Sequence, residues 1–308
     1  MRLSKEIFQK KKETIGYNKR DREIAQRLRG FHYEYNQEEF MFQLNGRVVV
    51  DFVLKPYFNR VRLGEGGLVV FNLFHSIYAH RAPTQIITEV TLAFLVMCAL
   101  YGYNDFTDRQ RDGLNEKKDK NFVISILQHP KFFLGVNLFL TIITLFMALL
   151  FFGTTKMKVL TLLYTVNFFY SKRFKSIPIL DIIVVGMWGG LYVMLSGRFQ
   201  WDLIFIVGIM TGMAHLFQIM TDKVSDGENK INTTIVALPD SELLFLAVLC
   251  FVLSWLLFFT LNIWWGGSAL LPLFIYGVTK QVTFSWYVSR AYFFICWIAL
   301  LTLFYGSL

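Results

Sequence analysis

From Arg62 onward, the chain alternates between apolar blocks and short polar connections. A helix needs about 20 mostly apolar residues to cross the hydrocarbon core of a bilayer, so the shorter blocks must extend into their polar flanks. The pattern predicts an all-α, multi-pass transmembrane bundle of about nine helices over residues 62–308. The predicted spans contain the apolar blocks 66–80, 85–103, 132–152, 157–171, 179–197, 202–221, 241–261, 267–279 and 290–306.

The composition supports a protein that lies in the lipid bilayer. Of the 308 residues, 55% are hydrophobic and 17% are charged, whereas about 25% of residues are charged in soluble domains. A soluble fold of this length could not hide so much apolar surface, so much of it must face lipid. The three cysteines, Cys98, Cys250 and Cys296, lie singly in apolar runs and are expected to be small buried hydrophobes.

Residues 1–61 form a basic, polar extension that differs from the rest of the chain. It has no apolar segment of the kind found in signal peptides. Residues 4–29 are predicted to form a basic helix on an anionic membrane surface. Asn45 and Gly46 separate two β-prone runs, which favours a hairpin over residues 39–54, and an interfacial helix over 47–60 is the alternative.

The distribution of Lys and Arg predicts the orientation of the spans. With nine spans, 27 of the 31 basic residues lie on the side of the N-terminus and 4 lie on the other side. Such an imbalance is typical of cytoplasmic loops. We therefore expect a cell-membrane protein with a cytoplasmic N-terminus, and the net charge of +9 reflects orientation and not nucleic-acid binding.

Two acidic segments follow the second and sixth blocks. The first contains Asp105, Asp108 and Asp112 in the pattern NDxxDxxxD, and the second contains Asp222 and Asp226 in the pattern DxxxD. If each preceding helix continues through its segment, the carboxylates of that segment share one helix face. Both segments follow even-numbered spans, so both are expected at the cytoplasmic boundary.

Stacked carboxylates repel one another unless a cation neutralises them. Mg²⁺ prefers hard oxygen ligands and commonly binds one or two carboxylates together with substrate phosphates. Ordinary solvated loop acids are the simpler interpretation. However, five of the eleven aspartates lie in these two segments, at a boundary where unpaired charge is costly. We therefore predict a site for Mg²⁺ and a diphosphate.

The two motifs, their positions and the predicted number of spans resemble the UbiA superfamily of intramembrane prenyltransferases. The resemblance covers about residues 62–308 and includes Gly227, Lys230, Thr233 and Thr234 after the second motif. It implies a cytoplasmic active site that binds Mg²⁺ and an isoprenoid diphosphate. The implied catalytic and metal-binding residues are Asp105, Asp108, Asp112, Asp222 and Asp226, and Asn104 is implied to shape the site.

A basic segment follows the fourth block on the same predicted side as the acids. Tyr170, Lys172, Arg173 and Lys175 resemble a segment of the same family and are expected to bind the substrate. Cations near a leaving diphosphate stabilise its developing charge. A plain positive-inside loop is the alternative. Arg62, just before the first span, is a weaker candidate for the same role.

Other polar residues within the apolar blocks have simpler interpretations. Glu89 lies in the second span, where an ionisable residue suggests function, but it could instead be a satisfied interhelical partner or lie near the outer boundary. His75, His80 and His215 are expected to be interfacial or hydrogen-bonded. Asp181 and Asp202 are expected at helix ends.

The sequence therefore predicts a Mg²⁺-dependent transfer of an isoprenoid chain from its diphosphate to a hydrophobic, aromatic acceptor. A membrane terpene cyclase with the same aspartates is the closest alternative. A transporter or cation channel is less favoured because the acids cluster at one boundary, whereas transport sites lie near the bilayer midplane.

Overall fold

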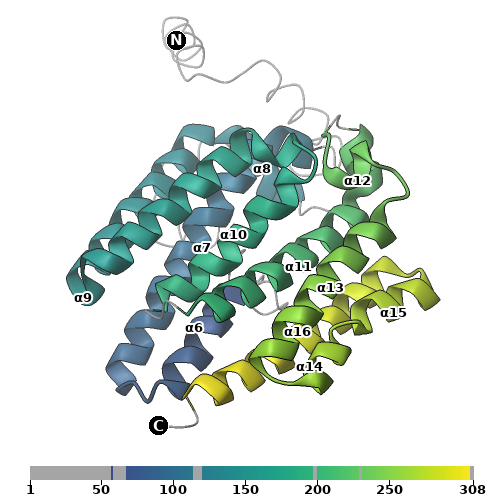
Figure 1. Ribbon diagram of the computed structural model, residues 1–308. Coiled ribbons are helices and arrows are strands. Elements are labelled where there is room, and N and C mark those ends of the chain that lie inside the picture. Colours follow the sequence, from purple (N-terminus) through teal and green to yellow (C-terminus); the bar gives the residue numbers. More distant parts are fainter. Residues whose placement is uncertain (1–56, 58–66, 114–119, 197–199, 229–230, 306–308) are drawn as a thin grey trace, which may run out of the picture. The chain divides into compact units, whose positions relative to one another are not determined.

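The computed structural model describes residue 57 and residues 67–113, 120–196, 200–228 and 231–305. Throughout these residues, the regular structure is helical and contains no strand (Figure 1). The predicted all-α fold class is therefore confirmed. The surface helix predicted over residues 4–29 and the hairpin predicted over 39–54 lie outside the described residues, as does Arg62. Of the alternative helix over 47–60, the structure describes residue 57 alone.

The helices follow the predicted apolar blocks closely. Three short helices, α8, α12 and α14, were not predicted, and α16 begins eight residues before its block. The elements are α6 (Gly67–Tyr78), α7 (Pro83–Asp112), α8 (Lys120–Gln128), α9 (Pro130–Lys172), the 3₁₀ turn η2 (Phe174–Ser176), α10 (Leu180–Leu195), α11 (Trp201–Glu228), α12 (Thr234–Ala237), α13 (Glu242–Thr260), α14 (Ile263–Ser268), α15 (Leu271–Thr279) and α16 (Val282–Tyr305).

Five of the described helices are long and apolar enough to cross a membrane. They are α7, α9, α11 (over Trp201–Val224), α13 and α16. Three shorter apolar stretches, Val69–Tyr78, Leu180–Leu195 and Ile263–Thr279, are also helical. The chain thus has the segments of a multi-pass membrane protein.

Helix α9 is two helical legs joined at Gly153. This glycine has φ 84° and ψ −179°, which is not a helical conformation and is one that glycine adopts without steric cost. Thr144 Oγ1 lies 2.7 Å from Tyr164 Oη, although a straight helix would separate the two residues by about 30 Å. The chain therefore folds back at Gly153 (Figure 1), and the separate predicted blocks 132–152 and 157–171 are confirmed.

The chain divides into two compact units. The smaller unit contains Met1–Glu65 and Cys98–Leu140, and the larger unit contains Gly66–Met97 and Thr141–Leu308. Helices α7 and α9 each contribute residues to both units.

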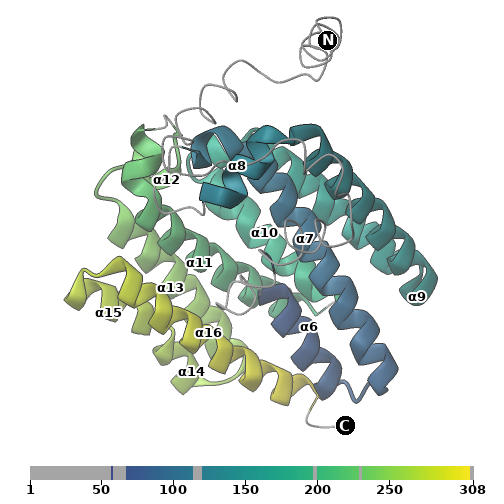
Figure 2. The same ribbon diagram turned by 180° about the vertical axis from the view of Figure 1, so that it is seen from behind.

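In the larger unit, α10 and α11 lie side by side (Figures 1 and 2), and glycines lie at their closest contacts. A Cβ atom added at Gly208 would lie 3.0 Å from the carbonyl oxygen of Gly186. One added at Gly189 would collide with the Thr211 side chain and lie 2.7 Å from the carbonyl oxygen of Val207. Small residues allow such close backbone approach between helices in lipid, where packing replaces the hydrophobic effect as the driving force.

Helix α11 also forms the centre of the apolar core of this unit, against α13 and α16. Its buried side chains include Met213, Leu216 and Phe217. Helix α6 joins the same core, because the ring of Phe71 stacks on Trp297 of α16 with 3.6 Å between ring centroids. The second acidic segment thus continues from the most deeply packed helix of its unit.

The tight contact at Gly189 predicts a large effect of adding one methyl group. We expect Gly189→Ala to destabilise the protein by about 1–3 kcal/mol, because overpacking forces the two helices apart. Gly277→Ala is the matched control, since a Cβ added there, within helix α15, meets nothing within 4 Å. The midpoint temperature of thermal unfolding in detergent measures the stability of both variants. Equal stability of the two would contradict this close packing.

Candidate functional site

The first acidic segment lies on the last turns of α7. The helix continues past the predicted apolar block to Asp112, so Asp105, Asp108 and Asp112 share one face, as expected from their spacing. Asp105 is 3% exposed and Asp108 is 4% exposed, whereas Asp112 is half-buried. Aspartates are rarely this buried unless their charge is matched by partners or a metal.

Both buried carboxylates have identified partners within the smaller unit. Tyr57 Oη donates a hydrogen bond of 3.1 Å to Asp105 Oδ2. Arg111 Nη1 lies 3.4 Å from Asp108 Oδ1, one turn along the same helix. The Arg111 contact follows from an i,i+3 spacing that is visible in the sequence. Tyr57 belongs to the predicted extension, and no spacing in the sequence connects it with Asp105.

The neighbouring turn of α7 is held by a second hydrogen bond in the same unit. Asn137 Nδ2, from the start of α9, donates to the carbonyl oxygen of Ala99 at 2.6 Å. Asn104, which was predicted to shape the site, lies on α7 directly before Asp105, and its carbonyl oxygen accepts a hydrogen bond from Thr107. Its role toward a substrate stays a prediction.

The second acidic segment lies on the last turns of α11, in the larger unit. This helix continues through Asp222 and Asp226 to Glu228, so these two carboxylates also share a face. Asp222 is half-buried. Lys223, between them in sequence, bonds to Glu242 of α13 at 2.7 Å. The two acidic segments belong to different units, and their convergence on one ligand stays a prediction.

Asp181 anchors the chain that follows the second acidic segment. It lies in the first turn of α10, at a helix end as predicted, and it is fully buried. It accepts hydrogen bonds from the backbone N–H and the hydroxyl of Thr234, and from the N–H of Ile182 at 2.9 Å. Ile231 N in turn donates to Asp226 O at 2.9 Å. The start of α10 is thereby tied to the chain leaving α11.

The basic segment divides into one interior residue and three cations that are more accessible. Tyr170 is buried at the end of α9, and its hydroxyl lies 3.3 Å from His215 Nε2 of α11. Lys172 and Arg173 are exposed, and Lys175 in η2 is half-buried. His215 is therefore hydrogen-bonded, as predicted. Because it precedes Asp222 by seven residues, it shares the helix face of the acids.

The carboxylate oxygens of the two segments are of the kind that Mg²⁺ prefers. Asp105 and Asp108 provide two buried carboxylates on one face of α7, and Asp222 and Asp226 provide two on one face of α11. Among the described residues, no three His, Cys, Asp or Glu side chains group closely enough to hold a metal by themselves. Mg²⁺ does not need such a cage, because it commonly completes its shell with substrate phosphates and water.

Comparison with known proteins identifies the family. The model of the UbiA prenyltransferase family matches residues 68–306, which is most of the chain. The chain belongs to the UbiA prenyltransferase family. The predicted resemblance is thus confirmed, whereas no curated protein sequence gives a significant match.

The UbiA fold is also found in solved structures of a UbiA homolog from Archaeoglobus fulgidus. The structure bound to DMAPP and Mg²⁺ has a TM-score of 0.60 and 15% identity, and the match covers 81% of this chain and 98% of that chain. The structure bound to GPP and Mg²⁺ has a TM-score of 0.58 and 14% identity, with the same coverage. A third, bound to Cd²⁺, has a TM-score of 0.55 and 13% identity, with 82% and 98% covered.

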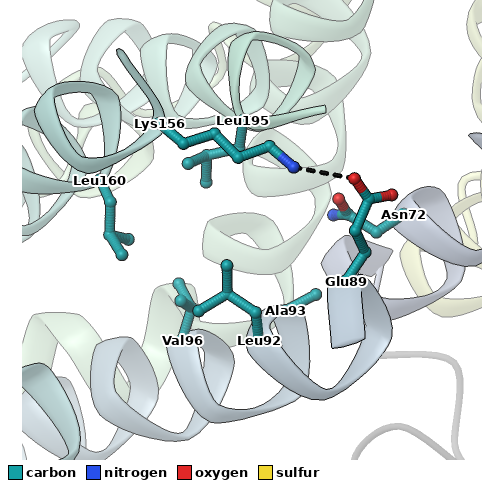
Figure 3. A pocket seen from close by; sticks show the side chains of 8 residues that line it. All are labelled: Asn72, Glu89, Leu92, Ala93, Val96, Lys156, Leu160 and Leu195. Carbon is teal, nitrogen blue, oxygen red and sulfur yellow. Dashed lines mark hydrogen bonds and ion pairs between the residues drawn. The ribbon is translucent and has the colours of Figure 1, made fainter. Parts of the chain in front are cut away.

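This UbiA family member also has a buried ionic cluster at Glu89, on the second turn of α7. Lys156 Nζ lies 2.9 Å from Glu89 Oε1 (Figure 3). Arg81 Nε lies 3.7 Å from the same oxygen, and the Ser76 hydroxyl donates to the other oxygen. Glu89 is therefore a satisfied interhelical partner near the start of its helix. Lys156, which the apolar pattern places in a loop between spans, is instead buried within α9.

A small pocket adjoins this ion pair within the larger unit. Its polar part consists of Asn72, Glu89 and Lys156 (Figure 3). The remaining lining side chains are aliphatic, namely Leu92, Ala93, Val96, Leu160 and Leu195. None of the predicted site residues lines this pocket, so we assign the ion pair to the stability of α6, α7 and α9.

The buried pair predicts a strongly asymmetric mutational response. We expect Lys156→Met alone to destabilise the protein by about 3–5 kcal/mol, because the Glu89 carboxylate loses its closest cation. The double variant Glu89→Gln with Lys156→Met should be markedly more stable than Lys156→Met. Lys158→Met, two residues away at a more accessible position, is the control. Thermal unfolding in detergent measures the stability of these variants. A double variant no more stable than Lys156→Met would contradict the assignment of a buried ion pair.

Proposed function

We propose that the protein is a Mg²⁺-dependent intramembrane prenyltransferase that moves an isoprenoid chain from its diphosphate to a hydrophobic, aromatic acceptor. The observation that carries the proposal is the burial of Asp105 and Asp108 on an apolar helix of a UbiA family member. The UbiA homolog from Archaeoglobus fulgidus, which has the same fold, binds DMAPP and GPP together with Mg²⁺.

In this proposal, nine spans cross the bilayer, counting the two legs of α9 and the three shorter apolar stretches. The imbalance of Lys and Arg supports a cytoplasmic N-terminus and an active site at the cytoplasmic boundary. An isoprenoid diphosphate is an amphiphile, so a site at this boundary allows its tail to remain in the apolar interior while its head reaches the aspartates.

The proposed mechanism assigns distinct tasks to the acids and the bases. The acids of the two segments hold Mg²⁺, namely Asp105, Asp108, Asp112, Asp222 and Asp226. When bound, Mg²⁺ supplies positive charge that offsets the charge of the leaving diphosphate. A second group of residues binds and orients the diphosphate, namely Asn104, Tyr170, Lys172, Arg173, Lys175 and Arg62. The basic side chains stabilise its negative charge as the bond from C1 to oxygen breaks.

Attack by the acceptor completes the proposed reaction. As C1 loses the diphosphate oxygen, a nucleophilic atom of the acceptor bonds to C1, and the acceptor loses a proton. The apolar side chains of the bundle exclude water, which would otherwise capture the electrophilic carbon. In the cyclase alternative, a double bond of the substrate itself attacks C1.

Removing a carboxylate from either acidic segment should abolish prenyl transfer. We expect Asp105→Ala and Asp222→Ala each to lower turnover by at least about 100-fold, as is typical for loss of one group that stabilises a developing charge. Asp202→Ala is the control, because Asp202 is exposed at the opposite end of α11. The measurement is transfer of a labelled prenyl group to aromatic acceptors by protein in liposomes.

The same assay separates the alternatives. Full activity of either aspartate variant, with normal membrane insertion, would contradict the assignment of the acids. A cyclic hydrocarbon formed without acceptor would contradict the transferase and favour the cyclase.

A further inference from the structure

Tyr57 lies outside the part of the chain that the family model matches, which begins at residue 68. It belongs to the basic extension predicted over residues 1–61. Nevertheless, its side chain is 2% exposed, and its hydroxyl donates a hydrogen bond of 3.1 Å to Asp105 Oδ2. The extension therefore contributes a buried polar group directly to the first residue of the first acidic segment.

The contact is built into its surroundings within the smaller unit. The ring of Tyr57 meets Phe122 of α8 edge to face, with 6.1 Å between ring centroids. A Cβ atom added at Gly102 would lie 3.2 Å from Tyr57 Oη and 2.9 Å from Asn137 Nδ2. Gly102 lies three residues before Asp105 on α7, so its missing side chain provides the room in which the tyrosine hydroxyl approaches the helix.

We propose that Tyr57 is a positioning residue for metal binding at Asp105. A hydrogen bond to one carboxylate oxygen fixes the rotation of the carboxylate and directs its other oxygen toward a cation. Carboxylates that bind metals are commonly held in this way, and loss of such a partner typically costs 10–100-fold in metal affinity or activity. The extension thus has a part in the chemistry and is not only an attachment to the membrane surface.

This inference rests on the proposed function, because it requires Mg²⁺ and a diphosphate at Asp105. Arg111 Nη1 lies 3.4 Å from Asp108 Oδ1 in the same segment, but that pair lies within one helix. The Tyr57 contact instead joins residues 48 positions apart. Its loss should therefore weaken the ordering of the carboxylate without removing any charge from the site.

The direct test is the Mg²⁺ dependence of Tyr57→Phe in the full chain. The first readout is thermal stabilisation by Mg²⁺ in the presence of an unreactive prenyl diphosphate analogue. We expect the Mg²⁺ concentration that gives half of the full stabilisation to rise about 10–100-fold. The second readout is turnover, which should approach the wild-type value at saturating Mg²⁺. Tyr287→Phe, at a position 60% exposed on α16, should change neither quantity.

A second variant tests the same contact without changing the Tyr57 side chain. Gly102→Ala should raise the Mg²⁺ requirement in the same direction, because the added methyl group would press on the Tyr57 hydroxyl, 3.2 Å away, as well as on Asn137 Nδ2, 2.9 Å away. If Tyr57→Phe or Gly102→Ala unfolds at lower temperature but keeps the wild-type Mg²⁺ dependence, Tyr57 is only structural and the inference is wrong. If the wild-type protein itself responds to neither Mg²⁺ nor prenyl diphosphate, the proposed function fails, and this inference fails with it.

Discussion

The structure is constrained above all by the cost of placing carboxylates at the end of apolar helices. Asp105 and Asp108 are almost inaccessible to solvent on α7, where each negative charge needs a partner. Tyr57 and Arg111 provide part of this compensation. In the proposed enzyme, metal ions and a diphosphate complete it, so the features that make these acids costly also make them a binding site.

The surrounding helices hold the second acidic segment on a rigid support. Helix α11 packs on α10 through glycines that leave no room for a methyl group, and Asp181 ties the start of α10 to the chain after Asp226. Lys223 adds a bond to Glu242 of α13. In the proposed enzyme, this packing also holds the metal-binding carboxylates of the second acidic segment in fixed positions, on which a metal site depends.

Much of this arrangement could be predicted from the sequence because it is periodic or local. Helical spacing alone predicted the shared face of Asp105 and Asp108, and the two legs of α9 follow from two apolar blocks around Gly153. Contacts between distant residues could not be predicted in this way. Neither the hydroxyl of Tyr57 on Asp105 nor the burial of Lys156 against Glu89 follows from spacing, since each depends on how separate parts of the chain pack.

The most direct test of the proposed site is an experimental structure of the protein in a lipid environment, with Mg²⁺ and an unreactive prenyl diphosphate analogue. We expect one diphosphate whose bound Mg²⁺ ions are ligated both by Asp105 and Asp108 and by Asp222 and Asp226. A diphosphate bound by one acidic segment alone, or acidic segments on opposite sides of the bilayer, would contradict the proposal.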